Sequence, residues 1–154
     1  MSGYRLHPDD PLRPPVKALI ERHFKLMRET SPPESCHVME ASELTAAGAT
    51  LYALSDGDEV LGIGALKPLA PEHGEIKSMH VAAEARGKGA SKALLEALLR
   101  EARDKGMKRV SLETGVEDAF LAARGLYERY GFETCPPFGD YVEDPLSVFM
   151  TKTL

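Results

Sequence analysis

The sequence has few of the residues that hold small proteins together by covalent or metal cross-links. Its 154 residues include no tryptophan and only two cysteines, Cys36 and Cys135, which are too few for a disulfide framework. Reduced thiols are typical of the cytoplasm, so we expect a cytoplasmic protein. The five histidines occur at no spacing typical of metal ligands, and we therefore expect no metal.

Long apolar runs and an excess of basic residues are also missing. No segment approaches the roughly 18 apolar residues of a membrane span, and the N-terminus lacks the apolar core of a signal peptide. The 19 Lys and Arg against 24 Asp and Glu give a net charge of −5, which argues against nucleic-acid binding. The length and the 43% hydrophobic content are instead typical of one globular domain, residues 1–154.

The hydrophobic periodicity changes along the chain. Short apolar or alternating runs predict strands at 4–6, 50–54, 60–66 and 75–81, with an Asp-Gly turn between the second and third. Spacing of 3.6 residues predicts helices at 15–29, 90–105 and 119–130, and a short one at 41–47. Further strands are expected at 108–114, 132–135 and 147–153. This order predicts an α+β fold: one mixed sheet, antiparallel in its first half, with helices on both faces.

A candidate ligand-binding loop joins the 75–81 strand to the 90–105 helix. It reads Arg86-Gly87-Lys88-Gly89-Ala90-Ser91-Lys92, and its glycines allow a ligand to approach the backbone closely. The first turn of the helix leaves amide N–H groups unpaired, which favours an anion there, and the lysines add positive charge. The loop matches neither the Walker motif nor the dinucleotide fingerprint. The residues predict a phosphate cradle, although a simple turn could have the same composition.

This loop resembles the [Arg/Gln]-x-x-Gly-x-[Gly/Ala] loop by which the GNAT superfamily of N-acyltransferases binds the pyrophosphate of acetyl-CoA. The preceding Glu75-Ile76-Lys77-Ser78-Met79-His80-Val81 and the later Leu126-Tyr127-Glu128-Arg129-Tyr130-Gly131-Phe132 resemble two further blocks of that family. Pro137-Phe138-Gly139-Asp140-Tyr141 is similar to a subgroup of small bacterial members. Two departures are Ser91, where the family usually has Gly or Ala, and the lack of an Asn near 116–121.

The resemblance implies a GNAT-like fold and an enzyme that moves an acetyl group from acetyl-CoA to a primary amine of a small molecule, an amino acid or a polypeptide. It implies that acetyl-CoA is bound by residues of the 75–81 strand and of the loop: Met79, His80, Val81, Arg86, Gly87, Lys88, Gly89, Ala90, Ser91 and Lys92. The backbone amides of the first three would stabilise the oxyanion. A homodimer is consistent with the resemblance.

Three side chains are predicted to be catalytic. Tyr127 matches the family's general acid, and a phenol can protonate a departing thiolate, although a core tyrosine is the alternative interpretation. Glu75 matches the position of a catalytic glutamate in some family members and is the leading candidate for the base, although a solvated strand end or a substrate anchor is the alternative. Glu113 matches a base position in other members and ranks second. Either carboxylate needs burial or a relaying water to act as a base. His80 ranks third, because strand alternation places it on the face opposite to Glu75.

Two other classes of function remain open at this point. One is a catalytically silent domain that binds or senses acyl-CoA, and the other is a pure interaction domain. The presence of both the loop and Tyr127 favours the enzyme. The acceptor pocket carries no motif, so the sequence does not predict which amine is acetylated.

Overall fold

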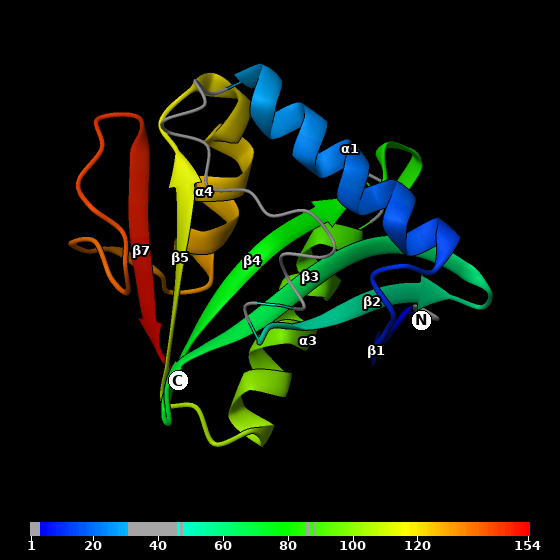
Figure 1. Ribbon diagram of the computed structural model, residues 1–154, viewed down its shortest axis with the longest axis horizontal. Coiled ribbons are helices and arrows are strands. Elements are labelled where there is room, and N and C mark those ends of the chain that lie inside the picture. Colours follow the sequence, from blue (N-terminus) through cyan, green and yellow to red (C-terminus); the bar gives the residue numbers. More distant parts are fainter. Residues whose placement is uncertain (1–3, 31–45, 47, 86, 88) are drawn as a thin grey trace.

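The computed structural model describes residues 4–30, 46, 48–85, 87 and 89–154. Seven strands form one mixed sheet in the order β1-β2-β3-β4-β5-β7-β6 (Figure 1). Four of them build the antiparallel first half, as predicted: β1 (Tyr4–Pro8), β2 (Thr50–Asp56), β3 (Glu59–Ala70) and β4 (His73–Val81). The second half contains β5 (Arg109–Gly115), β6 (Glu133–Thr134) and β7 (Ser147–Thr153).

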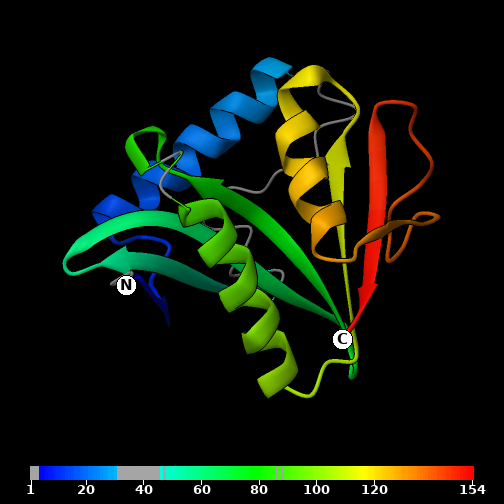
Figure 2. The same ribbon diagram turned by 180° about the vertical axis from the view of Figure 1, so that it is seen from behind.

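Helices cover both faces of the sheet, as the sequence predicts. Figure 1 shows α1 (Pro14–Thr30) in front of the sheet, and the reverse view of Figure 2 brings α3 (Ala90–Asp104) and α4 (Leu121–Arg129) to the front. Two short 3₁₀ turns precede the last two helices, η2 (Ala83–Ala85) and η3 (Asp118–Phe120). The helix predicted at 41–47 falls almost wholly outside the described residues. Within the described part of the chain, no helix is both long enough and apolar enough to cross a bilayer.

Buried side chains of α1, α3 and the central strands form the core on both faces of the sheet. Leu94, Leu95 and Leu98 of α3 are completely buried, as is Ile63 of β3. Burying each such side chain stabilises the fold by about 1.5–3 kcal/mol. The helix approaches β3 closely because Gly64 has no side chain: a Cβ there would lie 2.7 Å from Cδ1 of Leu98. This contact holds the N-terminus of α3, and with it the predicted phosphate loop, at the end of β4.

The β4–β5 pair is the structural feature that opens the site. These strands run parallel and pair only from His73 to Glu75 on β4 and from Arg109 to Ser111 on β5. Beyond Glu75 the strands part, while β5 stays paired with β7 along its whole length. The backbone groups of β4 on that side are therefore left for another partner.

We predict that Gly64→Val destabilises the fold by displacing α3. The new side chain would overlap the buried Leu98, which should cost about 1–3 kcal/mol and lower Tm by roughly 2–10 °C. Gly125→Ala is the matched control, since a Cβ there would meet only the Arg129 side chain, at 3.7 Å. In thermal unfolding, the Tm of the Gly125→Ala control should be at least as high as the Tm of the parent protein. Equal Tm values for Gly64→Val and the parent would contradict the close contact.

Candidate active site

A cavity of about 610 Å³ lies where β4 and β5 part. The predicted site residues that line it are Glu75, Met79, His80, Val81, Gly87, Gly89, Ser91, Lys92, Glu113 and Tyr127. Ala90 is buried and is not among the lining residues. Arg86 and Lys88 lie outside the described residues. The structure thus brings together the loop, the strand and the candidate acid and bases from five segments of the chain.

The two glycines of the loop have a backbone conformation that glycine adopts more easily than other residues. Gly87 and Gly89 both have φ of +80°, a left-handed conformation that strains any residue with a side chain. Gly89 is the N-cap of α3 and no side chain caps the helix there. A Cβ at either glycine would meet nothing within 4 Å, so the space beside them is open. The first-turn amides of α3 therefore face a space that an anion could fill.

A β-bulge in β4 changes which side chains share a face. Glu75, Lys77 and His80 lie opposite Lys67, Ala65 and Ile63 of β3, so the register shifts by one residue between Lys77 and His80. Ser78, in this interval, has φ of +55°. The extra residue reverses the alternation that strand geometry dictates. Our prediction that His80 lies opposite to Glu75 was wrong: both face the side of α1.

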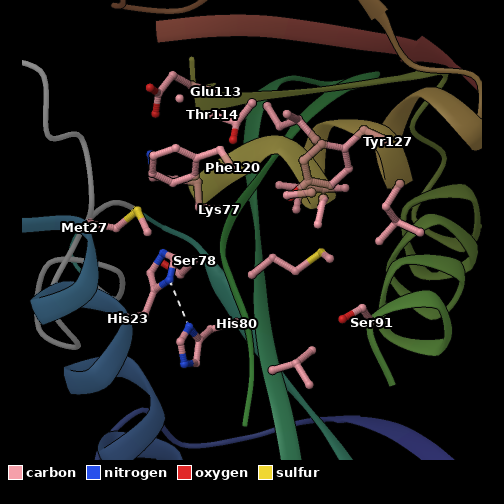
Figure 3. Close-up of a pocket in the computed structure, with 18 of the residues that line it drawn as sticks. His23, Met27, Lys77, Ser78, His80, Ser91, Glu113, Thr114, Phe120 and Tyr127 are labelled. Atoms are coloured by element: carbon pink, nitrogen blue, oxygen red, sulfur yellow. Dashed lines mark hydrogen bonds between the residues drawn. The ribbon is translucent and has the colours of Figure 1, made fainter. Parts of the chain in front are cut away.

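His80 contacts His23 of α1 across the cavity wall. Their Nδ1 atoms are 3.4 Å apart, and Figure 3 shows the pair on the α1 side, away from Ser91 and Tyr127. Burial lowers the pKa of His23 to about 3, with smaller effects from the charges of His80 and Lys77. His23 is therefore neutral at physiological pH, and it serves as a hydrogen-bonding group rather than as a cation.

The carboxylate of Glu75 is held by two donors. Its Oε2 accepts a hydrogen bond of 2.6 Å from the Tyr141 hydroxyl and one of 3.2 Å from Nζ of Lys77. The ammonium of Lys77 also donates to the Tyr141 oxygen at 2.7 Å. Glu75 and Lys77 are only 2% and 8% exposed, so this is a buried ion pair. Burial, together with the charge of Glu75, raises the pKa of Tyr141 and keeps its hydroxyl protonated.

Tyr141 belongs to the segment between β6 and β7, which aromatic packing fixes. Its ring lies 5.2 Å from Phe138 and 5.5 Å from Phe149, and Phe138 also contacts His73 at 6.2 Å. The Tyr141–Phe138 pair is edge-to-face, which is a favourable arrangement of aromatic rings, and the other two pairs are tilted. The cluster therefore positions the Tyr141 hydroxyl beside Glu75, although 66 residues separate the two in sequence.

Glu113 of β5 has the electrostatics of a base that works near neutral pH. Burial raises its pKa to about 7. A 2.9 Å hydrogen bond from Oγ of Ser147 and the charge of Lys77 oppose that rise, while the charge of Glu75 adds to it. Glu113 lines the same cavity as Glu75, and like Glu75 it is held by a hydroxyl from the C-terminal part of the chain.

Tyr127 of α4 lies on the other side of the cavity (Figure 3). Its ring packs 5.8 Å from Phe132, and burial raises its pKa to about 12, with a smaller effect from the charge of Glu113. Among the described residues its hydroxyl has no hydrogen-bond partner. A protonated hydroxyl at a cavity wall with no partner in the core is available to a ligand.

Sequence reasoning missed four polar side chains of this site: His23, Lys77, Tyr141 and Ser147. Two signals were visible. Lys77 is a charged residue in a strand that otherwise reads as buried, and Tyr141 closes the Pro-Pro-Phe-Gly-Asp-Tyr segment. Neither pattern reveals the partner, because the contacts join residues 64 to 66 positions apart.

Comparisons with known proteins agree with this geometry. A model described as the acetyltransferase (GNAT) family matches residues 16–132. The chain is 47% identical to the uncharacterized N-acetyltransferase YsnE of Bacillus subtilis, covering 90% of this chain and 92% of that one. It is 39% identical to the uncharacterized N-acetyltransferase YedL of Escherichia coli, covering 98% and 95%. The crystal structure of a GNAT family acetyltransferase from Elizabethkingia anophelis with acetyl-CoA bound is similar over the whole of both chains, with a TM-score of 0.73 and 20% identity.

We predict that the carboxyl of Glu113 titrates near pH 7, far above an ordinary glutamate. Ser147→Ala should raise this midpoint further, because the hydroxyl stabilises the ionised form. Because the pKa of Glu113 is raised in the folded parent protein, the folded state binds more protons than the unfolded chain between about pH 4.5 and pH 7. Stability from this group should therefore increase as the pH falls through that window, and Glu113→Gln should remove the effect. Carboxyl ¹³C NMR measures the midpoint, and a value below pH 5 would refute the assignment.

Proposed function

The chain belongs to the GNAT family of acetyltransferases, and from that premise we propose how its own residues transfer an acetyl group from acetyl-CoA to an amine. It is an N-acetyltransferase and acetyl-CoA is its co-substrate. The observation that carries the proposal is the cavity between the parted ends of β4 and β5. It is lined by residues at the N-terminus of α3, by the carboxylates of Glu75 and Glu113 and by the phenol of Tyr127. A cytoplasmic location and a homodimer remain predictions.

We assign the pyrophosphate of acetyl-CoA to the first turn of α3. Gly87 and Gly89 leave open space there, and the helix dipole and unpaired amides favour an anion. Lys92 lines the cavity beside them and adds positive charge. The pantetheine arm then runs along the parted edge of β4, where the amides of Met79, His80 and Val81 are proposed to stabilise the oxyanion of the tetrahedral intermediate.

We assign the proton transfers to three side chains. A base with a pKa near the working pH is the most effective, which favours Glu113. Glu75, first in our sequence-based ranking, already accepts hydrogen bonds from the Tyr141 hydroxyl and the Lys77 ammonium, and this favours a role in positioning the amine. Tyr127 is proposed to protonate the thiolate of CoA or to donate a hydrogen bond to it as the C–S bond breaks.

A screen of amines, amino acids and peptides tests the function directly. Acetyl-CoA-dependent release of free thiol should be detected with at least one class of amine acceptor, and mass spectrometry should find the acetyl group on its nitrogen. Binding of CoA without turnover of any amine would instead indicate the silent acyl-CoA-binding domain.

The loop assignment predicts that Gly89→Val weakens CoA binding at least tenfold, or about 1.4 kcal/mol. The valine would place methyl groups in the open space and disturb a left-handed N-cap. Gly106→Val is the matched control, because Gly106 follows the other end of α3 with φ of +83° and also has open space around it. Calorimetry should find parental CoA affinity for the control. The same affinity in a folded Gly89→Val protein would overturn the assignment.

The base assignment predicts that Glu113→Gln lowers kcat by about 10²–10⁴-fold and removes the ionisation near pH 7 from its pH profile. Glu75→Gln should chiefly raise the KM of the acceptor, because it weakens positioning. The exposed Glu133→Gln is the control for the charge change. If Glu75→Gln were the variant that lost the ionisation, the two roles would be exchanged.

The acid assignment predicts that Tyr127→Phe lowers kcat by about 10- to 10³-fold while leaving Tm and CoA affinity nearly unchanged. The variant keeps the ring packed on Phe132 and deletes only the hydroxyl. Tyr130→Phe, at the end of the same helix, removes a hydroxyl that bonds Glu96 outside the cavity, and should turn over normally. If Tyr127→Phe instead lowered Tm and left kcat unchanged, the hydroxyl of Tyr127 would have a structural role and would not be the acid.

A further inference from the structure

Ser78 has a backbone conformation that its residue type disfavours. Its φ of +55° is the one left-handed value among the non-glycine residues that the structure describes. A bulge with a left-handed first residue normally has glycine there, because a Cβ adds steric strain. Strained residues that persist in a well-packed fold are found disproportionately at functional sites.

The side chain of Ser78 carries a second cost. Its Oγ is buried and has no hydrogen-bond partner among the residues that the structure describes, and the residue lines the cavity. Burying a hydroxyl without a partner is destabilising, and native proteins rarely do so. Glycine at this position would remove both costs. The hydroxyl is therefore best explained by a partner that arrives with the substrate.

Lys77, the preceding residue, also has hydrogen-bonding capacity to spare. Its ammonium carries three N–H bonds, and among the described residues two are used, on Glu75 and on Tyr141. These partners fix the direction of the ammonium and leave the third N–H available. Because Lys77 is only 8% exposed and lines the cavity, that donor is largely shielded from water.

The position of Ser78 separates it from the side of the cavity that we assign to acetyl-CoA. Figure 3 shows Ser78 beside His23 on the α1 side, with Ser91 and Tyr127 across the cavity. A group that binds a lysine ammonium and a serine hydroxyl together must accept hydrogen bonds, and a carboxylate suits a cation best. Glu113 lies close enough for the charge of Lys77 to affect its pKa, so the base and the cation serve one cavity.

We propose that Lys77 and Ser78 bind the carboxylate of the acceptor, so that the acetylated amine belongs to a free amino acid. This inference rests on the proposed acetyltransferase function. The carboxylate would lie on the α1 side with the amine directed toward Glu113. The neutral amine nitrogen forms its bond to the acetyl carbon and the C–S bond breaks. Glu113 takes one proton from that nitrogen, and the thiolate of CoA takes one from the Tyr127 hydroxyl and departs as the thiol.

Matched acceptors test this proposal. Phenylalanine, leucine and lysine are each compared with the amine that lacks the carboxylate, namely phenethylamine, isopentylamine and cadaverine, and with the corresponding amino acid amide. We expect kcat/KM to be at least tenfold higher for an amino acid than for both of its analogues. A higher kcat/KM for the amides than for the amino acids would instead indicate that the enzyme recognises an amide carbonyl, as at a polypeptide N-terminus. That result would overturn the proposal that the acceptor is a free amino acid.

Two variants then test the residue. Ser78→Ala and Ser78→Gly should both lower kcat/KM for the amino acid by about 10- to 100-fold, mainly through the KM of the acceptor, with the KM of acetyl-CoA unchanged. Ser78→Gly should also raise Tm by roughly 2–4 °C, because it removes the strain and the unpaired hydroxyl. Ser55→Ala is the control. Ser55 is buried, forms a hydrogen bond with His7 and lies outside the cavity, so this variant should leave the kinetics unchanged.

Three results would count against the proposal, and one of them is independent of turnover. The first is acetylation of the plain amines as efficiently as of the amino acids, which would leave the proposed function intact. The second is parental kinetics in both Ser78 variants. The third is the absence of binding of all three amino acids to the enzyme–CoA complex in calorimetry. Absence of acetylation of any amine, amino acid or peptide would reject the proposed function itself.

Discussion

The short parallel contact between β4 and β5 is the constraint on which the rest of the site depends. After Glu75, β4 remains paired with β3 but loses its pairing with β5, and a cavity lies where these two strands part. Buried backbone groups need hydrogen bonds, so this edge is suited to a ligand that supplies them. The bulge at Ser78 then turns Glu75, Lys77 and His80 to one face. In our proposal, acetyl-CoA and the acceptor approach one reaction centre from opposite sides of the sheet.

The C-terminal part of the chain supplies a hydrogen-bond donor to each of the two carboxylates. Tyr141 and Ser147 each donate a hydroxyl, to Glu75 and to Glu113 respectively. Glu75 also has a buried ammonium beside it, whereas burial dominates at Glu113 and raises its pKa to about 7. Two residues of the same type thus have different surroundings, and our proposal assigns them different roles on that basis.

Local patterns predicted the elements, because periodicity and turn residues are properties of neighbouring positions. The helix of α3, the meander and the glycine loop follow from such patterns, and the resemblance identified the family. The bulge escaped prediction because strand register is decided across the sheet, and the face of His80 was wrong for that reason. The contact of Tyr141 with Glu75 joins distant segments, and the pKa of Glu113 depends on burial that no single segment determines.

A crystal structure with a bisubstrate analogue, in which the sulfur of CoA is joined through an acetyl linker to the amine of an acceptor, tests the central claim most directly. The account predicts the pyrophosphate at Gly87 and Gly89, the sulfur beside Tyr127 and the linker carbonyl at the parted edge of β4. The acceptor half should occupy the α1 side of the cavity, near Glu113. An acceptor half bound outside that cavity, or a linker carbonyl away from the β4 amides, would contradict it.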